Sequence, residues 1–301
     1  MQNVLFCSKH FEDDLGLTRS PRGCEFYLSR TNLLTISKQQ QTKHNQQSAP
    51  KIKMTTFDIN NSVAFVTGTN KKNGIGRAIV DVLLERGAMK VYATARNAAQ
   101  LEELVTSSKG RVVAVSLDVT DNQQTSILGE QYPDVNLVVN NAGYFGATSS
   151  LDDPETAVRE IQVNYFAPMS IVRSFAPVLK SKTNSAIVNV ASIASLVNFP
   201  AGGTYSASKA AMHSLTQAQR RDLAGSLVIG VYPGPIDTAM TEDLPFEKTP
   251  PSAVAKAILV AFQTGTEDVY PDNVAVQLHQ GWQSDAKALE IQMAQPTPVT
   301  A

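Results

Sequence analysis

Residues 63–76 of this chain have the sequence VAFVTGTNKKNGIG. The apolar run Val63–Val66 is typical of a short strand that is buried on both faces. A helix is expected from Ile75 to Arg86, because apolar residues recur there at helical spacing. Glycines between a strand and a helix permit a tight turn and let the backbone approach a phosphate, which the helix N-terminus attracts. The segment therefore predicts a strand–turn–helix unit that can bind the phosphates of a nucleotide.

The alternation of strand and helix continues along the chain. Strands that are apolar throughout and are separated by helices predict a parallel sheet with helices on both faces. The expected fold is therefore an α/β, doubly wound parallel sheet, formed by one domain over residues 54–301, with ligands bound beyond the carboxyl ends of the strands. Further strands are expected at 91–95, 111–117, 135–139, 186–190 and 227–232, with a short last one at 274–278. Helices are expected at 98–107, 154–179 and 205–224.

Composition excludes several functional classes. The formal net charge of −1 gives no electrostatic reason to expect nucleic acid or an anionic membrane as a partner. Uninterrupted apolar stretches are shorter than the roughly 18 residues of a membrane-spanning helix. Both cysteines, Cys7 and Cys24, precede the predicted domain, so it has no disulfide framework or cysteine metal site. The four histidines are scattered without ligand spacing, and no metal centre is expected.

Residues 1–53 differ from the rest of the chain, because they are rich in polar residues and lack a sustained hydrophobic period. We expect a disordered extension there. A transit peptide is an alternative that Arg19, Arg22 and Arg30 favour, whereas the acidic run 12–14 does not. A further alternative is that Met54 is the true start. The expected location of the protein is cytoplasmic, with targeting to an organelle by residues 1–53 as the alternative.

Tyr205 and Lys209 are four residues apart in a segment predicted to be helical, and Ser192 lies thirteen residues before Tyr205. Residues at this spacing share one face of a helix. A free tyrosine has a pKa near 10 and is a poor acid or base at neutral pH. A nearby ammonium group favours the phenolate, so Lys209 is expected to lower the pKa of Tyr205 and make it usable for proton transfer.

Six motifs, in this order and at this spacing, resemble those of the short-chain dehydrogenase/reductase family over most of residues 61–240. The glycine turn differs from the usual one, because five residues rather than three separate its first two glycines. The motifs are the turn with Gly68, Asn70, Lys71, Gly74, Ile75 and Gly76; Asp118 with Val119; Asn140-Asn141-Ala142-Gly143; Asn164; Ser192 with Tyr205 and Lys209; and the segment Pro233 to Thr238 with Gly234 and Ile236.

The resemblance implies a Rossmann-like fold and an oxidoreductase that interconverts a carbonyl and a secondary alcohol by hydride transfer. It implies that Tyr205 is the acid or base, that Ser192 holds the carbonyl oxygen, and that Lys209 also grips the nicotinamide ribose. Asn164 would hold a water that relays protons to Lys209. The cofactor would be contacted by Tyr205 and Lys209, by the residues named from the glycine turn, and by Asp118, Val119, Asn141, Ala142, Gly143, Pro233, Gly234, Ile236 and Thr238. A small-molecule substrate and a homodimer or homotetramer are implied as well.

The end of the second predicted strand indicates which cofactor is used. An acidic residue there would accept hydrogen bonds from the ribose hydroxyls of NAD and would repel a 2′-phosphate. This chain has Arg96 at that point and lysines in the glycine turn. A guanidinium can bind phosphate with two parallel hydrogen bonds. The sequence therefore favours NADP over NAD.

Alternatives remain for the residues and for the function. Asn164 could simply mark a helix kink near Pro168, and Ser192 could cap its own backbone. The chain could bind NADP as a sensor or scaffold without turnover. It could also reduce a carbon–carbon double bond or catalyse an epimerisation on the same fold.

Overall fold

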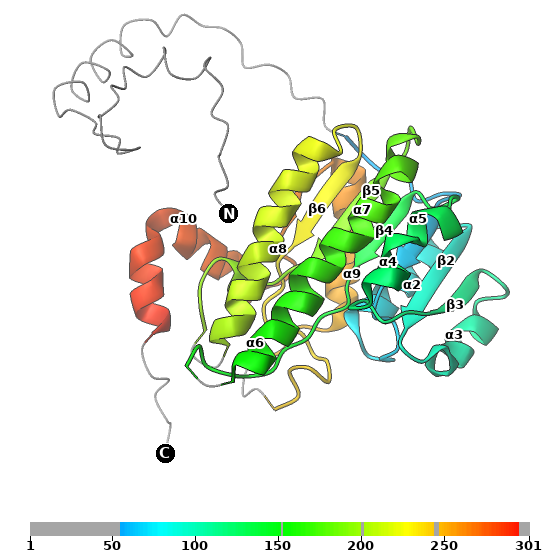
Figure 1. Ribbon diagram of the computed structural model, residues 1–301. Coiled ribbons are helices and arrows are strands. Elements are labelled where there is room, and N and C mark those ends of the chain that lie inside the picture. The colour runs from blue at the N-terminus through cyan, green and yellow to red at the C-terminus, as the bar shows by residue number, and fades with distance from the viewer. Residues whose placement is uncertain (1–54, 152, 200–201, 244–246, 295–301) are drawn as a thin grey trace, which may run out of the picture. The chain divides into compact units, whose positions relative to one another are not determined.

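The computed structural model of the chain describes residues 55–151, 153–199, 202–243 and 247–294. The extension expected at 1–53 lies outside these residues. The described residues form a parallel seven-stranded sheet with the strand order β3-β2-β1-β4-β5-β6-β7 (Figure 1). The strands are β1 Val63–Val66, β2 Lys90–Ala95, β3 Val112–Ser116, β4 Leu137–Asn140, β5 Ala186–Val190, β6 Leu227–Val231 and β7 Asp268–Val269.

The sheet is buried on both faces, as β1 illustrates. Ala64 and Val66 point into one apolar core, and Val63 and Phe65 point into another. Successive side chains of a strand face opposite sides, so a wholly apolar strand fits between two layers of helices. Helices α2 (Ile75–Glu85) and α9 (Pro251–Thr264) cover one face, and α5 (Leu128–Gln131) and α7 (Ala167–Lys180) cover the other. The doubly wound fold expected from the sequence is confirmed.

Further helices complete the two layers, and among them α8 (Gly203–Asp222) packs on the sheet against β5 and β6. Helices α6 (Pro154–Ile161) and α7 are joined by a π-helical turn, η4 (Gln162–Phe166), whose hydrogen bonds span one residue more than those of an α-helix. Helix α8 follows the strand β5 and packs against α6. The other elements are η3 Ala98–Leu101, α3 Glu102–Ser107, α4 Asn122–Ser126, η5 Ile193–Ser195 and α10 Asn273–Met293.

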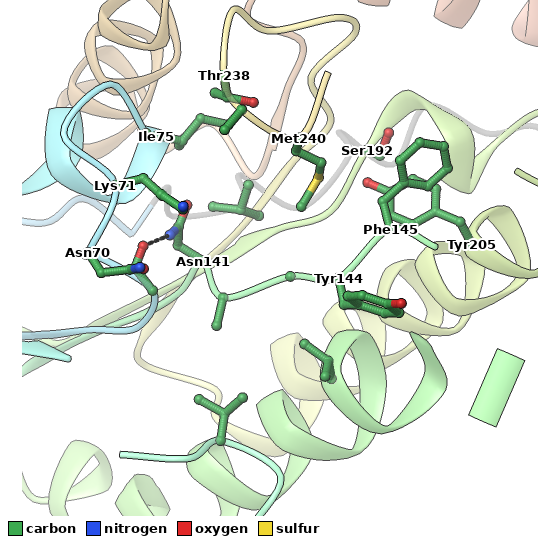
Figure 2. A pocket seen from close by; sticks show the side chains of 18 of the residues that line it. Asn70, Lys71, Ile75, Asn141, Tyr144, Phe145, Ser192, Tyr205, Thr238 and Met240 are labelled. Carbon is green, nitrogen blue, oxygen red and sulfur yellow. Dashed lines mark hydrogen bonds between the residues drawn. The ribbon is translucent and has the colours of Figure 1, made fainter. Parts of the chain in front are cut away.

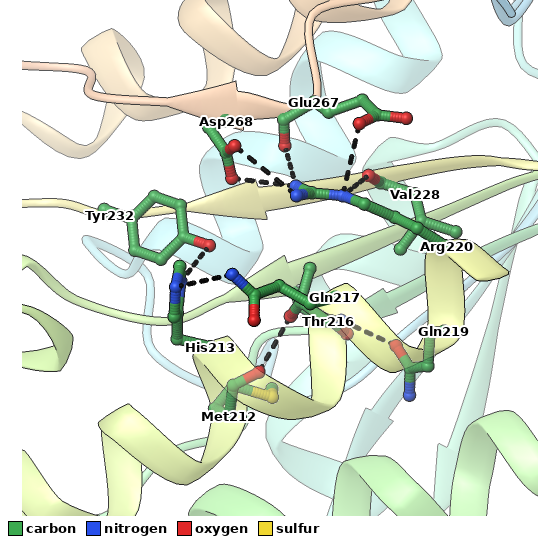
Figure 3. Close-up of polar contacts among 11 residues, drawn as sticks. Met212, His213, Thr216, Gln217, Gln219, Arg220, Val228, Tyr232, Glu267 and Asp268 are labelled. Carbon is green, nitrogen blue, oxygen red and sulfur yellow. Dashed lines mark hydrogen bonds and ion pairs between the residues drawn. The ribbon is translucent and has the colours of Figure 1, made fainter. Parts of the chain in front are cut away.

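Polar contacts fasten α8 to the last two strands. The Arg220 guanidinium donates hydrogen bonds to the Val228 carbonyl oxygen of β6 and to an Asp268 carboxylate oxygen of β7, at 3.2 and 2.8 Å (Figure 3). Nearer the middle of α8, His213 Nδ1 lies 2.8 Å from the hydroxyl oxygen of Tyr232, which is fully buried. These contacts fix the position of the helix that carries Tyr205 and Lys209.

One predicted strand is wrong. Residues 274–278 belong to α10, because the Asp272 side chain caps that helix by accepting a hydrogen bond from the Ala275 N–H. The last strand is instead β7, which has two residues and pairs with β6. The other predicted strands are found with small shifts at their ends. Among the described residues, no helix is both long and apolar enough to cross a membrane.

Candidate active site

A cleft of about 850 Å³ runs along the carboxyl ends of the strands (Figure 2). Two residues predicted for the site, Gly76 and Asn164, lie outside its lining. Asn70 and Lys71 lie at one end of the cleft, and Ser192 and Tyr205 lie at the other. The predicted residues that line it are Gly68, Asn70, Lys71, Gly74, Ile75, Arg96, Asp118, Val119, Asn141, Ala142, Gly143, Ser192, Tyr205, Lys209, Pro233, Gly234, Ile236 and Thr238.

The glycine turn is held close to the segment that follows β4. Gly68 has a φ of +69°, and a Cβ atom there would lie 2.8 Å from the Cα atom of Ala142. A Cβ atom at Gly76 would lie 2.6 Å from the carbonyl oxygen of Gly68, so this position also excludes a side chain. Asn141 Nδ2 donates hydrogen bonds to the Thr67 and Gly68 carbonyl oxygens at 2.8 and 3.0 Å. Gly76 therefore allows the turn to pack closely, although it does not itself line the cleft.

Two cations face the cleft near the end of β2. Arg96 is exposed and lines the cleft, as does Lys71 of the glycine turn. Lys72 is directed elsewhere, because its Nζ forms an ion pair with Glu103 at 3.0 Å. Asp118 turns its carboxylate onto its own loop and accepts hydrogen bonds from the Thr120 N–H and hydroxyl at 2.9 and 2.7 Å.

Ser192 and Tyr205 both line the other end of the cleft, where the Ser192 hydroxyl lowers the pKa of Tyr205. Ser192 Oγ donates a hydrogen bond to the Pro233 carbonyl oxygen at 3.4 Å. Ser192 also caps η5, since its Oγ accepts a hydrogen bond from the Ala194 N–H at 3.1 Å. The capping role considered as an alternative therefore exists together with the contact to Tyr205. The Tyr205 ring packs edge-on against Phe145, with 4.9 Å between the ring centroids.

The prediction that Lys209 would lower the pKa of Tyr205 below its ordinary value is wrong for this structure. Burial is the largest of the effects that raise the pKa of Tyr205 to about 12; the nearby Ser192 hydroxyl lowers it, and the Glu160 carboxylate raises it. Lys209 Nζ lies 5.7 Å from the centroid of the Tyr205 ring. Removal of water from the phenol outweighs any attraction between the phenolate and this ammonium group. Tyr205 is half-buried at the cleft, and the sequence pattern could not reveal how much water the surrounding chain would remove from it.

Lys209 is itself buried. Its Nζ donates a hydrogen bond to the Val190 carbonyl oxygen at 2.9 Å. Burial lowers the pKa of Lys209 to about 8. A Cβ atom placed on Gly143 would lie 3.8 Å from this Nζ and 3.5 Å from Asn164 Oδ1, so these groups are close neighbours. A group with this pKa can release or accept a proton near neutral pH.

Lys209→Met is expected to stabilise the protein at pH 7 by about 2 kcal/mol. The fall in pKa from 10.5 to about 8 corresponds to a cost of about 3 kcal/mol for burying the charge, and the lost hydrogen bond offsets about 1 kcal/mol of it. The unfolded chain holds this proton up to its own pKa, whereas the folded protein releases it from about pH 8. The stability of the wild type therefore rises relative to the variant between these two pH values.

Urea unfolding of both proteins at pH 7 and pH 10 measures this difference. Lys180→Met, at an exposed position in the last turn of α7, is the matched control. A variant at Lys209 that is less stable than the wild type at pH 7 contradicts the expectation.

Asn164 lies in the π-helical turn and is buried. Its Oδ1 accepts a hydrogen bond from the Tyr144 N–H at 2.9 Å, and its Nδ2 donates to the Tyr144 carbonyl oxygen and to Ser208 Oγ at 2.8 and 2.9 Å. The side-chain amide thus holds the segment after β4 in place, next to the cleft. A π-helical turn also leaves backbone carbonyls without their usual helical partners.

One face of α6 borders the cleft, which the sequence did not predict. Val158 and Gln162 are one helical turn apart, as are Glu155 and Arg159, and all four residues line the cleft. The Arg159 guanidinium lies 4.3 Å from the centroid of the Tyr144 ring. This spacing was visible in the sequence, but nothing there showed which face of α6 would meet the cleft.

The residues present fit a nicotinamide dinucleotide. The glycines leave room for close backbone approach at the start of α2, where a pyrophosphate is attracted. Cations lie near the end of β2, and the polar groups of Ser192, Tyr205 and Lys209 lie at the far end of the same cleft. Its volume of about 850 Å³ is in the range of small-molecule and cofactor sites.

A doubly wound sheet with a glycine turn at the carboxyl end of β1 is the architecture of dinucleotide-binding proteins. A family model described as short chain dehydrogenase matches residues 62–248, and the chain belongs to this family. The family binds nicotinamide cofactors and acts on small molecules, and this protein is one of its oxidoreductases.

Known relatives agree with this assignment. An uncharacterized oxidoreductase of Staphylococcus saprophyticus is 30% identical over 220 residues, which are 68% of this chain and 93% of the relative. A short chain dehydrogenase from Burkholderia cenocepacia, solved in complex with NADP, is 38% identical with a TM-score of 0.74 and covers 79% of this chain and 100% of its own. A family member from Burkholderia phymatum, solved with NAD, is 20% identical with a TM-score of 0.67, covers 81% and 100% of the two chains, and shares the fold.

Proposed function

We propose that this protein is an NADP(H)-dependent oxidoreductase that interconverts a carbonyl and a secondary alcohol, with Tyr205 as its acid or base. The observation that carries the proposal is that Ser192 and Tyr205, with Lys209 one helical turn from Tyr205, line the same end of the cleft. This arrangement supplies two hydroxyl groups to one carbonyl oxygen and a titrating group beside them.

The reduced nicotinamide supplies a hydride to the carbonyl carbon when it is bound. Tyr205 donates its phenolic proton to the oxygen as the carbon–oxygen double bond becomes single. Ser192 donates a hydrogen bond to the same oxygen and stabilises the charge that develops on it. Lys209, with a pKa of about 8, is protonated near neutral pH and can return a proton to Tyr205. One hydride and one proton thus convert the carbonyl to an alcohol.

The pKa of Tyr205 favours the reductive direction. A phenol with a pKa of about 12 is a weaker acid than free tyrosine, but it is almost wholly protonated at neutral pH and so carries the proton that reduction needs. Alcohol oxidation would need the phenolate, which is scarce under these conditions. We therefore infer that carbonyl reduction is the faster direction near neutral pH.

NADP is the cofactor that the charges around the cleft favour. Arg96 and Lys71 line it, and the end of β2 carries no acid that would repel a 2′-phosphate. The Burkholderia cenocepacia relative, which was solved with NADP, is consistent with this choice. The homodimer or homotetramer expected from the family stays a prediction.

A panel of ketones, aldehydes and secondary alcohols, assayed with each cofactor by the absorbance of reduced nicotinamide, tests the proposal. We expect oxidation of NADPH by at least one ketone or aldehyde, with the corresponding alcohol as product. If NADPH binds but no compound in the panel reacts, the protein is a sensor or scaffold. If an unsaturated carbonyl compound is reduced while keeping its carbonyl group, the enzyme is a double-bond reductase.

A further inference from the structure

Glu160 is a fully buried carboxylate that no sequence motif indicated. It lies in the last turn of α6, and its two oxygens have different partners. Oε1 accepts a hydrogen bond from the Gly146 N–H at 2.8 Å, and Oε2 accepts one from the Thr204 hydroxyl at 2.6 Å. Both donors are uncharged. A buried carboxylate held only by neutral donors is costly, which points to a specific role.

We propose that Glu160 is a positioning residue: it fixes the start of α8 against the segment after β4, and it places a negative charge next to the residue that precedes Tyr205. The inference rests on the proposed function, in which that phenol is the proton donor.

Each hydrogen-bond partner of Glu160 is adjacent in the sequence to an aromatic residue of the site. Thr204 directly precedes Tyr205, and Gly146 directly follows Phe145. The Phe145 and Tyr205 rings pack edge-on, so one carboxylate ties together the two chain segments that carry this aromatic pair. If both hydrogen bonds were lost, the two segments would keep the packing of the two rings and the Asn164 amide, which bonds to Tyr144 and Ser208, and the position of the phenol would loosen.

Helix α8 has a start that lacks the usual stabilising groups. Its N-cap residue is Gly202, which offers no side-chain hydrogen bond, and its first turn contains no acidic residue. The positive end of a helix dipole favours a negative charge nearby. Glu160 supplies that charge from a different helix, through its contact with Thr204. A local role in α8 therefore accompanies the effect on Tyr205.

The charge of Glu160 also acts on the phenol directly. Its carboxylate raises the pKa of Tyr205, in the same direction as burial. The other polar and charged groups of the site come from three elements. Lys209 belongs to α8 itself, and Ser192, which is uncharged, precedes η5. Arg159 belongs to α6 and lies over the Tyr144 ring. Tyr165, in the π-helical turn that packs on α8, contacts Phe166 at 5.1 Å between ring centroids.

Glu160→Gln separates the charge from the contacts. The amide oxygen can accept from the Gly146 N–H, and the amide nitrogen can donate to the Thr204 hydroxyl, so both segments stay tied. We expect Tyr205 to ionise at a pH lower by roughly half a unit, because a repulsive charge is gone. A purely structural role would leave this midpoint in place.

The tyrosinate absorbance, read directly after rapid mixing to each pH, measures the ionisation. Subtracting the same titration of the corresponding Tyr205→Phe protein isolates Tyr205 from the other seven tyrosines of the eight in the chain. Glu85→Gln, which removes an exposed charge at the end of α2, is the control and should leave the midpoint unchanged.

Glu160→Ala tests the contacts. It should lower kcat roughly 10- to 100-fold at every pH, with NADPH affinity retained. If the midpoint of the Tyr205 titration is unchanged in Glu160→Gln, the inference is overturned. A kcat equal to that of the wild type in Glu160→Ala overturns it as well. The titration needs no substrate, so it decides about the charge even if the panel of carbonyl compounds shows no turnover, a result that would overturn the proposed function instead.

Discussion

Tyr205→Phe should lower kcat for carbonyl reduction roughly 100- to 10,000-fold, the range that a general acid contributes. The change removes the phenolic proton and the hydroxyl that lies near Ser192. It leaves the ring, whose edge-on contact with Phe145 keeps the start of α8 in place. NADPH should therefore still bind, which a fluorescence titration of the variant measures beside the steady-state rate.

Tyr132→Phe is the matched control for this substitution. Tyr132 packs against Phe65 and Tyr92, outside the lining of the cleft, so removal of its hydroxyl should leave kcat unchanged. A Tyr205→Phe protein that keeps more than about a tenth of the wild-type rate would sink the proposed mechanism, because a general acid contributes more than that.

The second large effect is expected at the end of β2. Arg96→Asp should weaken NADPH binding about 100-fold and leave NADH binding almost unchanged. A hydrogen bond to a charged group contributes about 1.5–3 kcal/mol, and each 1.4 kcal/mol is about a factor of ten in affinity. The new carboxylate would in addition repel a 2′-phosphate and could accept hydrogen bonds from the ribose hydroxyls of NADH.

Dissociation constants for both cofactors, measured by the same titration at one salt concentration, test this assignment. Arg86→Asp changes the charge by the same amount at an exposed position beyond the far end of α2 and should leave both constants as they are. An unchanged ratio of the two constants in Arg96→Asp refutes the contact with the phosphate.

The sheet was predictable because its strands are apolar on both faces and short, and because helices of ordinary length separate them. The last strand was not, since β7 has two residues and leaves no periodic signal. Residues 274–278 have the apolar content of a strand, but Asp272 starts a helix before them by capping it. A cap of this kind was the local signal that would have corrected the prediction.

The positions of the candidate site residues were predictable from their motifs, whereas their electrostatics were not. The pattern placed Ser192, Tyr205 and Lys209 together, and the structure brings them to one end of the cleft. The pKa of Tyr205 depends instead on the water that packing removes and on Glu160, which lies 45 residues earlier in the chain. A glutamate in an amphipathic helix is usually solvated, so its burial followed only from the tertiary structure.

The π-helical turn η4 sets the phase between α6 and α7. If one residue were deleted from it, the two helices would become one regular α-helix, and α6 would rotate by about 100° relative to α7. Glu160 would then point away from Thr204, and the carboxylate would lose its hold on the start of α8. A single codon gained or lost in this turn could therefore couple or uncouple that carboxylate from Tyr205 during evolution, without any substitution in the residues that surround the phenol.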